Sequence, residues 1–74
     1  MKFFEYVKLK GLDLLRDDIT FLRSRMSSVP IKEQRTVILR RYVELWCDTM
    51  SSCDNAVKRQ NEGRRAANLW LLSI

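Results

Sequence analysis

Residues 27–34 read SSVPIKEQ, and this stretch divides the chain into two helical segments. Pro30 disfavours helical geometry at the residue before it, Val29, while its fixed φ angle suits the first turn of a new helix. Ser27 or Ser28 is a suitable N-cap for that helix, because a serine hydroxyl accepts a hydrogen bond from a backbone N–H group of the first turn. The stretch therefore predicts that one helix ends and another begins here.

The segment before the break has apolar residues three or four positions apart. This spacing predicts one amphipathic helix from about residue 3 to about residue 26. Gly11 falls on the same side of that helix and costs about 1 kcal/mol relative to alanine, so we expect another helix to approach closely there. The apolar positions are Phe4, Val7, Leu15, Ile19, Leu22 and Met26.

The segment after the break continues the helical spacing from about residue 31. It predicts a long helix that lies antiparallel to the first one. Its apolar positions are Ile31, Ile38 or Leu39, Tyr42, Leu45 or Trp46, Met50, Cys53 and Val57.

Two interpretations of the remaining chain stay open. In the favoured one, the long helix continues past Ser52, with a bend or break between Asp48 and Asn55, where weak helix formers follow one another. In the other, the helix ends near Thr49, and Ser51 with Asp54 caps a third helix that runs to about Leu72.

The fold class expected from these patterns is all-α, with residues 1–74 forming a single domain. A chain of this size buries only about 60% of its unfolded surface, so an antiparallel helical hairpin alone has a small core. The closing segment AANLWLLSI, residues 66–74, is also too apolar to remain in water. We therefore expect the hairpin to dimerise into a helical bundle, and a monomeric three-helix bundle is the alternative.

No set of residues suggests catalysis, a metal site or a cofactor. The chain has no histidine, and its only cysteines, Cys47 and Cys53, are about 9 Å apart on one helix, too far for a disulfide. Asp13, Asp17 and Asp18 are expected on a solvated helix face. These observations favour a protein that is not an enzyme, with its two thiols reduced.

The segments at the two ends of the chain do not match targeting or membrane sequences. Residues 1–11 lack a long apolar core, and residues 66–74 fall well short of the roughly 20 apolar residues that span a bilayer. We expect a cytoplasmic protein without membrane contact.

Charge provides the main functional signal. The formal net charge is +5, and the sequence pI is about 9.7, which favours binding to polyanions. Nucleic acid is the favoured partner, and an acidic protein surface, contacted by a regulator or inhibitor, is the alternative. The residues expected to bind nucleic acid are Lys58, Arg59, Gln60, Arg64 and Arg65, with Arg40, Arg41 and Lys32 as flanking phosphate contacts.

Two stretches, VPIKEQRTVILRRYVE at 29–44 and NAVKRQNEGRR at 55–65, resemble the C-terminal promoter-recognition module of bacterial sigma factors and related small phage transcription regulators. In that family, a helix that ends in an Arg-Tyr pair precedes a helix-turn-helix. Arg41 and Tyr42 match the pair, while Ala56, Val57, Lys58 and Arg64 match the start and body of the recognition helix. The resemblance implies that Val57 packs inward and that Lys58, Arg59 and Arg64 face DNA. A DNA-binding transcription regulator of phage or plasmid type is the corresponding function.

Overall fold

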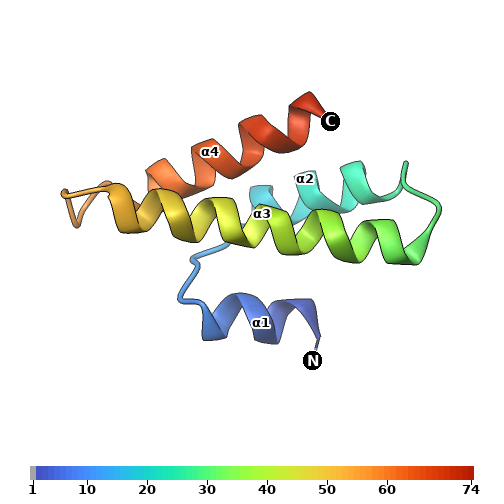
Figure 1. Cartoon of the computed structure of the whole chain (residues 1–74), viewed down its shortest axis with the longest axis horizontal. Helices are drawn as coiled ribbons and strands as arrows, with labels where there is room; N and C mark the ends of the chain where they lie inside the picture. The colour runs from blue at the N-terminus through green and yellow to red at the C-terminus, as the bar shows by residue number, and fades with distance from the viewer. Residues whose placement is uncertain (1) are drawn as a thin grey trace.

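The computed structural model describes residues 2–74, and within this range the chain folds into four α-helices without a β-strand (Figure 1). The expected all-α class is confirmed. α1 and α3 run in one direction across Figure 1, and α2 and α4 run back. The helices are α1 (Phe3–Leu9), α2 (Arg16–Met26), α3 (Lys32–Ser52) and α4 (Arg59–Ser73).

The predicted single helix over residues 3–26 is wrong, because the chain leaves helical geometry after Leu9. Gly11 has a φ angle of 73°, in the left-handed region that glycine enters without steric cost. Its N–H group donates to the carbonyl of Lys8 at 3.0 Å and closes the end of α1. A Cβ atom at Gly11 would meet nothing within 4 Å, so this glycine serves the turn and not a close helix approach.

The break around Pro30 is confirmed, but its details differ from the prediction. Ser27 and Ser28 donate to carbonyls of α2, those of Ser24 at 2.6 Å and Arg25 at 2.8 Å, so they complete the first helix and do not cap the next. The N-cap of α3 is Ile31, without a side-chain hydrogen bond. Apolar spacing cannot distinguish these two roles of a serine.

The second break lies at residues 53–58, so it overlaps the end of the expected interval, Asp48 to Asn55, and extends beyond it. The side-chain oxygen of Asn55 accepts hydrogen bonds from the N–H groups of Val57 at 2.9 Å and Lys58 at 3.2 Å. An asparagine that binds the backbone two residues on forms a turn, and this turn competes with the helix. A separate C-terminal helix therefore forms, as in the second interpretation, but it begins at Arg59 and Ser51 does not cap it.

The most extensive packing joins α3 to α4, and not α3 to the N-terminal segment as the predicted hairpin required. Gly63 of α4 lies directly on Trp46 of α3. A Cβ atom at Gly63 would lie 2.8 Å from the indole Nε1 and 2.9 Å from the Trp46 carbonyl oxygen. Only glycine allows this approach. Trp46, Tyr42, Leu71 and Val43 are the largest fully buried side chains.

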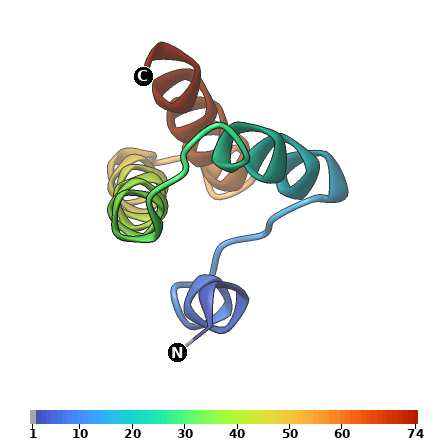
Figure 2. The ribbon, with the colours of Figure 1, turned by 90° about the vertical axis from the view of Figure 1, so that its right-hand side faces the viewer.

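α2 completes the core beside this helix pair, and α1 lies apart from α2 and α4 when the molecule is viewed along α3 (Figure 2). Val7 of α1 and Leu12 after it are buried and attach the N-terminal segment to the core. The C-terminal end of α4 is less covered than the sequence implied. Leu71 is buried, but Leu69, Leu72 and Ile74 remain 57%, 57% and 55% exposed. None of the helices in residues 2–74 has the length and apolar character needed to cross a membrane.

Candidate nucleic-acid interface

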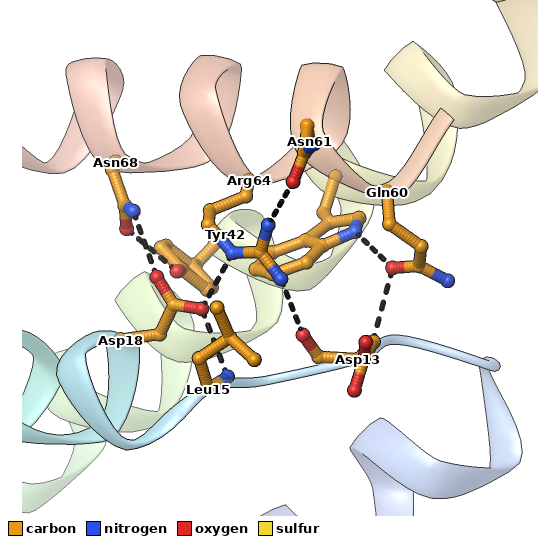
Figure 3. Close-up of polar contacts among 9 residues, drawn as sticks. Asp13, Leu15, Asp18, Tyr42, Gln60, Asn61, Arg64 and Asn68 are labelled. Carbon is orange, nitrogen blue, oxygen red and sulfur yellow. Dashed lines mark hydrogen bonds and ion pairs between the residues drawn. The ribbon is translucent and has the colours of Figure 1, made fainter. Parts of the chain in front are cut away.

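Arg64 and Asp18 form a buried ion pair between α4 and α2 (Figure 3). The guanidinium Nε lies 2.7 Å from Asp18 Oδ2, and the two side chains are only 16% and 5% exposed. A second guanidinium nitrogen donates to the Asp13 carbonyl at 2.7 Å, and the third donates to the Asn61 side chain. The guanidinium also stacks over the Trp46 ring, 5.2 Å from its centroid, which adds a cation–π attraction.

Asp18 accepts two further hydrogen bonds. The Leu15 N–H group donates to Oδ2 at 3.0 Å, which fixes the start of α2, and the Asn68 amide donates to Oδ1 at 3.1 Å. The side-chain oxygen of Asn68 in turn accepts a hydrogen bond from the Tyr42 hydroxyl at 2.7 Å. One polar network thus joins α2, α3 and α4, and in residues 2–74 every buried side-chain nitrogen or oxygen has a partner.

Gln60 belongs to the same internal structure. Its amide nitrogen donates to the Gly11 carbonyl at 2.8 Å. Its amide oxygen accepts hydrogen bonds from the Trp46 indole N–H and the Asp13 backbone N–H, each at 3.1 Å. Gln60 therefore holds the segment between α1 and α2 against the start of α4.

Two residues expected to face nucleic acid are consequently turned inward. The predictions of an exposed Arg64 and of a DNA-facing Gln60 are wrong in orientation, because their polar groups already have partners within the chain. Asp18, expected on a solvated face, is buried at 4% exposure. No local pattern marks their inward orientation, since the partners that draw these residues to other segments lie 46 or more residues away, apart from the Gln60–Trp46 contact at 14.

Lys58, the N-cap residue of α4, and Arg59 and Arg65 in the first half of the helix are exposed, and we name these three residues the α4 cationic surface. Across residues 2–74 only two ion pairs form, and neither involves these three residues. Lys58 and Arg65 are seven residues apart, close to two full helical turns, so they lie on one side of α4. Arg59 donates through Nε to the Cys53 carbonyl at 3.3 Å.

Arg40 and Arg41 of α3, the expected flanking contacts, are exposed but have neighbours of their own. Arg41 pairs with Glu44 at 3.3 Å, and both side chains are about half exposed. Arg40 lines a hollow with Phe3, Tyr6, Thr36 and Leu39, between α1 and α3. Lys32 begins α3 at the end of the molecule away from the 53–58 connection (Figure 1).

The residues that carry the sigma-factor resemblance fall on different kinds of structure. Tyr42 is fully buried, whereas Ala56, Val57 and Lys58 lie in the connection before α4. Val57 is 88% exposed, so the packing role that the resemblance implies for it is wrong. Lys10, which the sequence did not single out, lines a hollow together with Arg59.

The buried phenol of Tyr42 predicts a loss of stability in strong base. Burial, and to a lesser degree the Asp18 charge, raise the pKa of Tyr42 well above its usual value, while Arg64 partly offsets the shift. Above about pH 10 an unfolded tyrosine loses its proton but folded Tyr42 keeps it, so the folded state binds more protons. The stabilisation from the Tyr42 pKa shift is fully present below about pH 10. As the pH rises further, the free energy of unfolding falls by up to about 1.4 kcal/mol per pH unit.

Urea unfolding between about pH 8 and pH 11 measures this effect, with Tyr42→Phe and Tyr6→Phe as the compared variants. Tyr42→Phe should flatten the fall above about pH 10, while Tyr6→Phe, at a partly exposed position, should retain it. Equal slopes in both variants would contradict the assignment.

No protein-family model, curated protein or solved structure matches this chain. The exposed cations and the exposed apolar end of α4 are therefore the features from which a function can be inferred.

Proposed function

We propose that this chain is a small, non-catalytic regulatory protein that binds nucleic acid through the α4 cationic surface. One observation carries the proposal: Lys58, Arg59 and Arg65 are exposed and have no carboxylate partner in residues 2–74, in a chain of net charge +5. Each free cation that neutralises a phosphate releases condensed counterions, which supplies affinity without base contacts. A cytoplasmic location is part of the proposal, and free thiols at Cys47 and Cys53 fit a reducing compartment.

The available groups favour phosphate contacts over the reading of bases. Gln60 would have been the strongest adenine-reading side chain, but its amide is engaged inside the molecule. The Asn61 oxygen accepts a hydrogen bond from Arg64. Lysine and arginine contacts to phosphate position a protein but carry no sequence information. We therefore expect modest sequence preference from one copy of the chain, and a role in transcription would require a further source of specificity.

Salt dependence of binding to a short DNA duplex tests the proposal. Three phosphate contacts predict a slope of about −2.7 in a plot of log affinity against log salt concentration. Replacing Lys58 and Arg65 together by alanine should reduce the magnitude of that slope by about 1.8 and weaken binding to all sequences alike. Fluorescence anisotropy at several salt concentrations measures both quantities.

Lys2→Ala is the matched control, because it removes one exposed cation at the start of α1. It should leave the slope nearly unchanged. Absence of measurable binding at about 50 mM salt, to both duplex and single-stranded nucleic acid, would contradict the proposed function.

We further propose that two copies associate through the apolar end of α4, which comprises Leu69, Leu72 and Ile74. All three side chains are more than half exposed, and Leu69 and Leu72 lie on one side of the helix because they are three residues apart. Adjacent exposed apolar side chains of this kind mark contact surfaces. An antiparallel pairing places Leu69 opposite Leu72 of the second copy and keeps the two Arg65 charges apart. Such a dimer would present two α4 cationic surfaces.

Light scattering at tens of micromolar protein tests the association. The native chain should have twice its monomer mass, and Leu72→Glu should return it to the monomer without unfolding, since Leu72 is 57% exposed. Arg65→Ala, at a position beside the contact, should leave the dimer intact. A monomeric native chain would contradict the dimer and favour a different protein as the partner of this apolar end.

A further inference from the structure

A surface hollow beside the α4 cationic surface brings together residues from distant parts of the sequence. Lys10 follows α1, Cys47, Met50 and Ser51 belong to the last turns of α3, and Arg59 begins α4. Its volume is about 180 Å³, far more than the roughly 15 Å³ that a single water requires. The hollow is open to solvent at the end of the molecule where the proposed nucleic-acid contacts lie.

The cationic groups at the hollow have free hydrogen-bond donors. Arg59 uses only Nε within residues 2–74, on the Cys53 carbonyl, so both terminal guanidinium nitrogens are available. Lys10 makes no ion pair in the same range, and its ammonium lies over the Tyr6 ring at 5.7 Å from the centroid. Ser51 is exposed, and its hydroxyl makes no hydrogen bond within the described chain. Four donor atoms thus remain at one opening: two guanidinium nitrogens, one ammonium nitrogen and one hydroxyl oxygen.

The local charge is positive. Among residues 2–74, no acidic side chain lines the hollow. Burial raises the pKa of the Cys47 thiol, the Lys10 charge opposes this rise, and the Asp48 charge, which is smaller in effect, adds to it. Lys10 and Arg59 line the hollow without a lining carboxylate from residues 2–74, and this favours an anion there.

We propose that this hollow binds a phosphate group, with Lys10 and Arg59 on its oxygens and Ser51 as an additional donor. The inference rests on the proposed function, which makes the group a phosphodiester of the nucleic-acid backbone. It adds Lys10 to the interface and places the path of the bound strand across the junction between α1, α3 and α4. Arginine supplies two parallel donors to phosphate oxygens, and lysine supplies a point charge.

The salt slope for a short DNA duplex provides the first test. Lys10→Ala should reduce the magnitude of the slope by at most about 0.9, because Arg59 stays on the same phosphate, whereas Lys2→Ala should not change it. Both lysines are exposed, so both variants should retain the helical content and melting temperature of the native chain.

Protection of Cys47 provides the second test. The Cys53→Ser variant leaves Cys47 as the only thiol, and its alkylation by iodoacetamide reports access to the hollow that it lines. At a ligand concentration ten times the dissociation constant, DNA and inorganic pyrophosphate should each slow alkylation by about tenfold. Adding Lys10→Ala should abolish the protection, with each rate compared with that of the same variant without ligand.

The outcomes separate the two proposals. Protection by both ligands, lost with Lys10→Ala, supports the phosphodiester site. DNA binding without protection of Cys47, and with an unchanged slope in Lys10→Ala, would overturn the site and leave the proposed function standing. Protection by pyrophosphate without DNA binding would support a site for free phosphate groups and overturn nucleic acid as their source. Absence of both DNA binding and Cys47 protection would overturn the nucleic-acid function and the phosphate site together.

Discussion

The ion pair between Asp18 and Arg64 fixes how the helices of this small protein meet. Little of either side chain is exposed to solvent, and the guanidinium contacts the Asp18 carboxylate, the Asp13 carbonyl and the Trp46 ring. Burying two charges has a large desolvation cost, which only a fully satisfied geometry offsets. Here Leu15, Asn68 and Tyr42 complete that geometry. We infer that the pair sets the register between α2 and α4, while Gly63 against Trp46 sets the distance between α3 and α4.

Local patterns in the sequence were sufficient for some of these features and not for others. Helical spacing and Pro30 predicted an all-α fold with a break near residue 30, because both signals act over a few residues. The same spacing passes through Gly11 in phase, so it could not show that a left-handed glycine ends α1. Gly63 likewise looked like an ordinary position within a basic helix.

Charged residues gave the least reliable prediction of orientation. A carboxylate such as Asp18 among other acidic residues, and an arginine such as Arg64 among other basic ones, are each typical of a solvated face. Their pairing joins positions far apart in the chain and depends on the tertiary fold. This pairing affects the candidate interface, because the polar groups of Arg64 and Gln60 bind partners within the chain and are not free for nucleic acid. Lys58 and Arg65 remain exposed, and Arg59 is joined by Lys10 in one hollow. The function that we propose therefore relies on phosphate contacts and not on the reading of bases.

A double-mutant cycle on Asp18 and Arg64 tests the central claim most directly. The free energy of unfolding is measured in urea for the native chain, Asp18→Ala, Arg64→Ala and the double variant. If the pair fixes the fold, each single substitution should cost about 2–4 kcal/mol, somewhat below the cost of breaking a fully buried pair, because Arg64 retains 16% exposure. The coupling energy should exceed about 1.5 kcal/mol. Single costs below about 0.5 kcal/mol with additive effects would mean that Arg64 lies at the surface, and would contradict this account.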